Sequence, residues 1–129
     1  MTRELDVERV LCTLGELDLD GSRGFTVGAG DWPLRGFVVR DARGAPRAYV
    51  NWCPHAGHGL NLRPHRFLAP GGELIVCCSH GALFERASGL CIAGPCAGRR
   101  LRPVPIEVVG EFVLLAPGAD PAALADVSR

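Results

Sequence analysis

The chain has 129 residues, which predicts a single domain and leaves no room for a redox domain together with a separate catalytic domain. Its 14 basic and 14 acidic residues cancel, and no basic run is interleaved with aromatic residues, which argues against nucleic acid or an anionic membrane surface as a partner. There is no signal-peptide pattern and no apolar run of about 18 residues, so we expect an unanchored, cytoplasmic protein.

The residue types favour strands over helices. The chain contains 17 Gly and 10 Pro and has no Lys or Gln, a composition typical of short strands joined by turns. All 14 basic residues are Arg, which suggests a GC-rich coding sequence and a bacterial source. We therefore predict an all-β fold, with one domain over residues 1–129, a core over about residues 8–116 and a tail over residues 117–129.

The first half of the chain alternates apolar runs with Gly- and Pro-containing turns. Strands are predicted near residues 9–14, 25–27, 36–40 and 47–52. A turn is expected over residues 21–24, and Cys12 in the first run is interpreted as a small buried apolar residue.

The second half continues the same pattern. Further strands are predicted near residues 66–68, 73–77, 82–86, 105–109 and 112–116, with residues 90–98 as a loop. Gly110-Glu111 suits a two-residue hairpin turn, and Asp120-Pro121 predicts the start of one helical turn.

Two of these strands lead into loops that carry metal-ligating residues. The strand at 47–52 runs into Cys53-Pro54-His55, and the strand at 73–77 runs into Cys77-Cys78-Ser79-His80. Each loop supplies one thiolate and one imidazole, so the pair predicts a metal site with two sulfur and two nitrogen ligands. Paired strands would bring the two loops together, and nearby glycines would let backbone N–H groups approach the ligands.

The pattern C-x-H followed by C-x-x-H resembles the Rieske [2Fe-2S] family, over roughly residues 8–116. The resemblance implies stacked antiparallel sheets with a two-loop cluster-binding subdomain and one [2Fe-2S] cluster. It further implies that Cys53 and Cys77 hold one iron while His55 and His80 hold the other, solvent-facing one. The expected residues beside the ligands are Gly57 and Gly81, with Gly94 and Pro95 in a loop that covers the cluster.

Four positions depart from the high-potential branch of that family. Its two disulfide-forming Cys positions hold His58 and Ser79 here, so the bridge cannot form. Its Ser and Tyr hydrogen-bond donors are replaced by Ala82 and Phe84. Weaker stabilisation of negative charge on the cluster predicts a reduction potential near the low end of the Rieske range, about −150 mV, as in the ferredoxin branch.

The resemblance implies a Rieske-type ferredoxin, a one-electron carrier between a flavin reductase and a terminal oxygenase, with no catalytic residues or small-molecule substrate of its own. A small electron-transfer subunit resembling that of nitrite reductase, serving a large reductase subunit, is the alternative. A structural Cys₂His₂ zinc module is a third reading, although zinc fingers usually pair Cys with Cys and His with His. A Cys–His nucleophilic pair is a fourth, without a third group to support it.

Several residues are left without an assigned role. His58 is either a donor beside the site or incidental, and His65 is expected to be an exposed loop residue. Cys78 is expected to be packed, while Cys91 and Cys96 are expected to be reduced thiols that could pair under oxidation. Arginines that form either a solvated surface or a face for an acidic partner are Arg63, Arg66, Arg99, Arg100 and Arg102.

Overall fold

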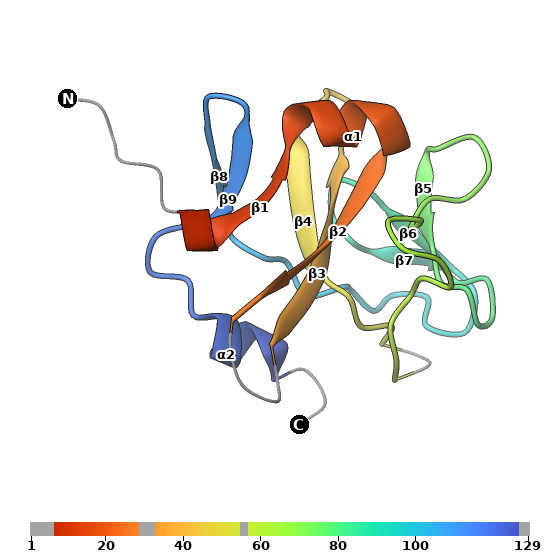
Figure 1. Cartoon of the computed structure of the whole chain (residues 1–129). Coiled ribbons are helices and arrows are strands. Elements are labelled where there is room, and N and C mark those ends of the chain that lie inside the picture. The colour runs from red at the N-terminus through yellow and green to blue at the C-terminus, as the bar shows by residue number, and fades with distance from the viewer. Residues whose placement is uncertain (1–6, 29–32, 55–56, 127–129) are drawn as a thin grey trace.

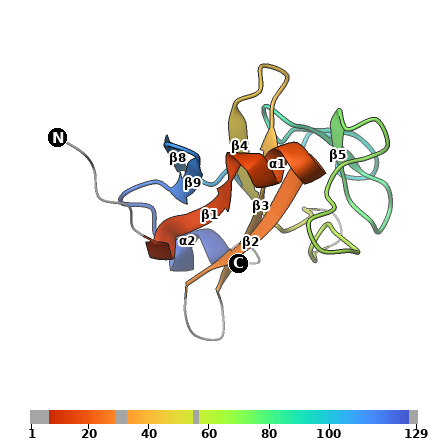
Figure 2. The same cartoon turned by 45° about the horizontal axis from the view of Figure 1, so that its top comes forward.

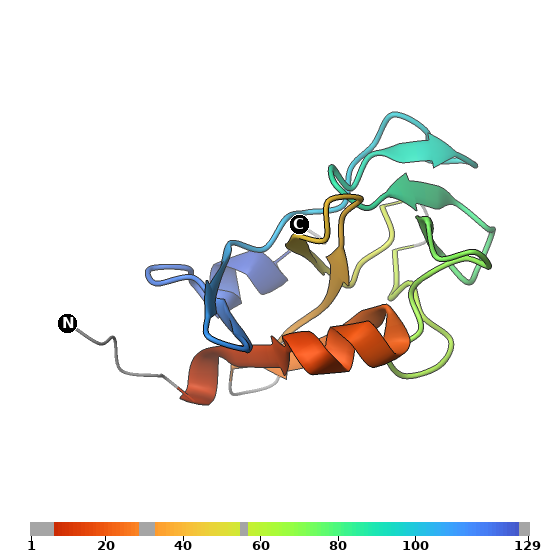
Figure 3. The same cartoon turned by 90° about the horizontal axis from the view of Figure 1, so that it is seen from above.

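Three small antiparallel sheets make up most of the molecule, in a computed structural model that describes residues 7–28, 33–54 and 57–126. The central sheet has the order β2-β3-β4, and its strands are β2 (Ser22–Val27), β3 (Leu34–Arg40) and β4 (Pro46–Val50). A sheet of order β1-β9-β8 lies on one side of it, and a sheet of order β5-β6-β7 lies on the other (Figures 1 and 3). The expected fold of stacked antiparallel sheets is confirmed.

The two outer sheets contain short strands. The strands of the first are β1 (Val10–Thr13), β8 (Ile106–Val109) and β9 (Phe112–Leu115). The strands of the second are β5 (Leu74–Val76), β6 (Leu83–Glu85) and β7 (Cys91–Ala93). Val109 pairs with Phe112, which confirms the two-residue hairpin turn between β8 and β9. Among the described residues, no helix is long and apolar enough to cross a bilayer.

Strand β3 separates two hydrophobic cores because both of its faces are buried. Phe37 and Val39 point into a core shared with β5 and β6, while Val38 points into a core shared with β1 and β9. Side chains alternate between the faces of a strand, so one central strand serves both cores. The core on the β5–β6–β7 side also contains Cys53 and Cys77, which places the predicted metal ligands against the main packing of the domain.

A helix between β1 and β2 was not predicted from the sequence. It is α1 (Leu14–Asp20), which crosses one edge of the central sheet (Figure 2). Thr13 caps it: the Thr13 hydroxyl accepts from the Glu16 amide, and the Glu16 carboxylate accepts from the Thr13 amide. Leu17 is its buried residue. This capping box stabilises a helix over residues for which the sequence predicted no element between the strand at 9–14 and the turn at 21–24.

Other expectations differ from the structure in detail. Residues 22–24 belong to β2 and not to a turn, and residues 91–93 form β7 within the expected loop. The expected strand at 66–68 is reduced to one isolated bridge between Leu68 and Ile75. Helix α2 (Pro121–Ala125) begins after the Asp120 cap, as predicted, and η1 (Val7–Arg9) is a short 3-10 turn before β1.

Candidate metal centre

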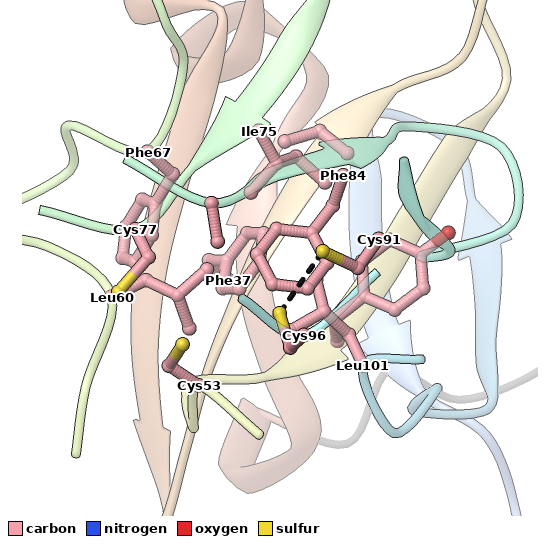
Figure 4. Close-up of a cluster of buried hydrophobic side chains, with 13 residues drawn as sticks. Phe37, Cys53, Leu60, Phe67, Ile75, Cys77, Phe84, Cys91, Cys96 and Leu101 are labelled. Carbon is pink, nitrogen blue, oxygen red and sulfur yellow. Dashed lines mark hydrogen bonds between the residues drawn. The ribbon is translucent and has the colours of Figure 1, made fainter. Parts of the chain in front are cut away.

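Cys53 and Cys77 lie in one buried cluster at the ends of two strands. Cys53 follows β4 after two residues, and Cys77 directly follows β5. Their exposed fractions are 0% and 1%, and Figure 4 shows both side chains at one end of the same core, beside Leu60. The register of β5 with β6 and of β3 with β4, together with the packing of these sheets on Phe37, brings the two loops together.

The two cysteine loops have the same backbone hydrogen bonds. In the first, the Gly57 amide donates to the Cys53 carbonyl at 2.9 Å and the Cys53 amide donates to the His58 carbonyl at 2.8 Å. In the second, the Gly81 amide donates to the Cys77 carbonyl at 3.1 Å and the Cys77 amide donates to the Ala82 carbonyl at 2.9 Å. Each bond therefore joins the cysteine to the residue four or five positions later.

A glycine closes each of these loops at the same offset from its cysteine. Gly57 has φ 70° and Gly81 has φ 67°, a left-handed conformation that L side chains adopt only at a cost. The equal spacing of Cys53 to Gly57 and of Cys77 to Gly81 was visible in the sequence and would have revealed the matched loops. The backbone conformation thus explains why glycine follows each cysteine at this offset, and the place of both glycines beside a cluster stays a prediction.

The pKa of the Cys77 thiol is raised above its ordinary value, although opposing effects act on it. Burial raises the pKa of Cys77 most, and the neighbouring Cys53 raises it further. The backbone N–H groups of Ser79 and His80 act in the opposite direction, because they stabilise the thiolate. A positively charged metal would stabilise both sulfurs as thiolates, so two adjacent buried cysteines are suited to metal binding.

The other predicted site residues that the structure describes do not lie in the buried cluster that contains Cys53 and Cys77. His80 is exposed on the second loop, while His55 lies outside the described residues. Gly94 packs against Ala82, directly after the second loop, and Pro95 is exposed beside it. Within the described parts of the chain, no three His, Cys, Asp or Glu side chains are grouped closely enough to hold one ion. A binuclear cluster of the Rieske type asks for two protein ligands at each iron.

One residue that positions the loops was missed. The Asn51 side chain accepts from the Leu60 amide at 2.7 Å and donates to the Asn61 side chain at 2.9 Å. The Leu60 carbonyl in turn accepts from the Cys78 amide at 2.8 Å. Asn51 therefore ties the end of β4, through Leu60, to the second cysteine loop. An amide side chain just before the motif was the available signal.

The expectations for His65 and Cys78 were wrong. His65 is partly buried: its Nδ1 accepts from the Gly24 amide at 3.0 Å, and its carbonyl accepts from the Ser22 hydroxyl at 2.7 Å. These two hydrogen bonds hold the segment that connects the two cysteine loops against β2. Cys78 is exposed and not packed. His58 is exposed, with its Nδ1 close to the Gly59 carbonyl.

Cys91 and Cys96 are buried next to the candidate site. All six cysteines are free thiols, and the Cys96 thiol donates to the Cys91 sulfur at 3.0 Å, as the dashed line in Figure 4 marks. Burial raises the pKa of Cys96 to about 12, with further contributions from Cys91 and Cys53. Cys12 lies in the other core as predicted, and burial followed by the charge of Glu16 raises its pKa to about 11.

Comparison with known proteins identifies the family of this chain. The family model described as the Rieske [2Fe-2S] domain matches residues 9–116. The ferredoxin of carbazole 1,9a-dioxygenase from Nocardioides aromaticivorans IC177 is 28% identical, with a TM-score of 0.63 over 84% of this chain and 95% of that one. The Sphingomonas yanoikuyae B1 ferredoxin is 21% identical, with a TM-score of 0.57 over 87% of this chain and 97% of that one.

A domain of this shape also occurs inside a larger enzyme. Dicamba monooxygenase is 26% identical, with a TM-score of 0.59, and the match covers 88% of this chain but 33% of that one. No curated protein sequence is detectably similar to this chain. The two ferredoxins are thus matched along almost their whole length, and the oxygenase over about a third of its length.

Proposed function

Because this chain belongs to the Rieske [2Fe-2S] domain family and so binds a [2Fe-2S] cluster, we propose that it is a Rieske-type ferredoxin that carries single electrons from a flavin reductase to a terminal oxygenase. The full-length match to a ferredoxin supports a carrier over an oxygenase, which carries this domain as about one third of its chain. The proposal places the carrier in the cytoplasm, where its six free cysteines would stay reduced.

The observation that carries the proposal is the pair of buried thiols on matched loops. Cys53 and Cys77 would hold the inner iron, and His55 and His80 the outer one. Gly57 and Gly81 would close the two loops around the cluster, and Gly94 with Pro95 would cover it from a third side. The cluster supplies a reversible one-electron couple, while the chain holds it in place and excludes water from its inner end.

The residues around the second loop also set the expected potential. Ala82 and Phe84 are buried and carry no hydroxyl group, so neither can donate a hydrogen bond to the cluster or to Cys77. The N–H groups of Ser79 and His80 are the donors found near that sulfur. We expect a potential near the low end of the Rieske range, about −150 mV.

Metal and sulfide analysis tests the cofactor and its ligands. Purified protein is expected to contain two irons and two acid-labile sulfides per chain, and the reduced form an EPR signal of a Rieske cluster. Cys53→Ser and Cys77→Ser are expected to lose the cluster. The matched control is Cys78→Ser, which removes an exposed thiol next to Cys77 and is expected to keep full iron content. Loss of iron in the control alone would overturn the ligand assignment.

The reduction potential of the cluster tests whether the proposed histidines are ligands. His80→Cys is expected to retain cluster and to lower its potential, because a thiolate adds negative charge that an imidazole does not. His58→Ala changes an exposed histidine of the first loop and is expected to leave the potential unchanged. An unchanged spectrum and potential in His80→Cys would show that His80 is not a ligand. Co-purification with one fixed large reductase subunit would instead support the nitrite-reductase-like alternative.

A further inference from the structure

Three exposed arginines lie beside the first cysteine loop. Leu101 is 1% exposed and anchors this segment in the core, while Arg100 and Arg102 on either side of it are exposed. Residues two apart on an extended segment share a face, so both guanidinium groups project from the same side. They line a pocket of about 280 Å³ whose other walls are Val50, Trp52 and Pro54.

Hydrogen bonds hold this segment against β4 and the cysteine loop. The Val50 amide donates to the Arg102 carbonyl at 2.9 Å, and the Leu101 amide donates to the Gly89 carbonyl at 2.9 Å. The Arg99 guanidinium donates to the Pro54 carbonyl at 3.1 Å, directly after Cys53 in the chain. The positive charges are therefore held next to a proposed ligand and do not sit on a free loop.

These charges are not neutralised within the described residues. Ion pairs there involve Arg23, Arg40 and Arg47, whose partners are Asp and Glu side chains near α1 and in the turn before β4. Arg99 and Arg102 instead donate to backbone carbonyls. The pocket wall contains no carboxylate, although the chain as a whole is neutral. The pocket wall therefore carries a net positive charge beside the first cysteine loop.

We propose that the pocket formed by Trp52, Pro54, Arg100 and Arg102 receives carboxylate side chains of an acidic surface on the redox partner protein. The inference rests on the proposed function, because an electron carrier has to meet a partner protein close to its cluster. Electron-transfer complexes are small and transient, and complementary charge raises their rate of association. A guanidinium pair is suited to carboxylates because each group can donate two parallel hydrogen bonds.

Two small oxidants of opposite charge test the charge at this end of the cluster. Reduced, cluster-loaded protein is mixed in a stopped-flow instrument with the cobalt(III)–EDTA monoanion or with the hydroxymethylferrocenium monocation at low ionic strength. Two positive charges about 8 Å from the reacting ion change its local concentration by about fourfold at 10 mM salt. The double variant Arg100→Gln/Arg102→Gln is therefore expected to oxidise about fourfold more slowly with the anion, and faster by a similar factor with the cation.

A competitor tests binding apart from electron transfer. Hexaglutamate is expected to slow oxidation of the wild-type protein by the anion, and to lose this effect in the double variant. Arg43→Gln, in the turn at the other end of β4, is the control and is expected to leave both rates unchanged. Equal effects of the control and the double variant would overturn the inference, as would stronger competition by a single-stranded oligonucleotide. Failure of the proposed function would look different, as co-purification with one fixed large reductase subunit while the effects of Arg100→Gln/Arg102→Gln on the two oxidants persist.

Discussion

Gly94 is the residue at which a single methyl group would press on the candidate metal centre. A Cβ added there would lie 2.9 Å from the Ala82 Cα and 3.2 Å from the Ala82 Cβ. Ala82 accepts the backbone hydrogen bond of Cys77 through its carbonyl at 2.9 Å. We predict that Gly94→Ala destabilises the protein and also disturbs the second cysteine loop.

Gly98, in the same loop, provides a matched control. Gly94 has φ 99° and Gly98 has φ 91°, but a Cβ at Gly98 would meet nothing within 4 Å. Both substitutions to Ala therefore cost about 1–2 kcal/mol of backbone strain, and both reduce the entropy of the unfolded chain alike. Only Gly94→Ala adds the collision with Ala82, which is worth about 1–3 kcal/mol if it resembles overpacking of a core.

The difference between the two variants is the quantity to measure. Thermal unfolding is followed by far-UV circular dichroism and by visible absorbance of the cluster, at one scan rate because cluster loss is irreversible. In a domain of this size 1 kcal/mol lowers Tm by about 4 °C, so Gly94→Ala is expected to melt about 4–12 °C below Gly98→Ala. Its reduced EPR spectrum is expected to shift, whereas that of Gly98→Ala is not.

Two outcomes would refute this reasoning. Equal melting temperatures for the two variants would mean that the loop moves away from Ala82 without cost. An unchanged EPR spectrum in a strongly destabilised Gly94→Ala would mean that Ala82 does not transmit strain to Cys77.

Three further measurements test other features. Burial alone would raise the pKa of Asp41, but hydrogen bonds from the Ala45 amide, the Arg47 guanidinium and the Arg43 amide, with the charge of Arg47, lower it. The stability that this carboxylate contributes is present above the ordinary Asp pKa of 3.8 and is lost as pH falls through the lower pKa of the folded state. Asp41→Asn is therefore expected to lower Tm at pH 7 and to make Tm fall less steeply in acid. Tyr49 donates to the Arg86 carbonyl at 2.6 Å, so Tyr49→Phe is expected to cost about 1–2 kcal/mol in urea unfolding; no change would show that water replaces the hydroxyl. When the protein is unfolded and refolded with oxidised glutathione, Cys91 and Cys96 are expected to form a disulfide that stabilises the fold by about 2 kcal/mol. Mass spectrometry would show the bond as a loss of two hydrogens from the tryptic peptide 87–99. Alkylation of both thiols after refolding would contradict this prediction.

The fold class and most strands could be predicted because their signals are local. Alternating apolar residues and frequent turn residues indicate strands wherever they pack, and β4, β5, β6 and the β8–β9 hairpin lie close to their predicted positions. Helix α1 was missed because its signal is a pair of reciprocal hydrogen bonds between Thr13 and Glu16, which composition does not reveal. Strand β7 was missed because Gly94 and Pro95 made its surroundings look like a loop.

The roles of single polar residues were harder to predict. His65 looked like an exposed loop residue, yet it bonds to Gly24, which is far from it in sequence. Cys78 looked packed because it adjoins a buried cysteine, but it lies in the turn that follows Cys77, where its side chain is exposed. Both errors come from inferring burial from neighbours in the chain.

The sequence by itself determined the family and the cofactor of this protein, because Cys53-Pro54-His55 and Cys77-Cys78-Ser79-His80 supply the proposed ligand types in the order typical of a Rieske domain. Only the tertiary structure decided what surrounds them. It packed the two thiols into one core and gave the two loops the same backbone hydrogen bonds. It also brought Arg99, Arg100 and Arg102 against Pro54, across more than forty residues of chain. Such contacts depend on how the sheets pack around Phe37, which no local pattern encodes.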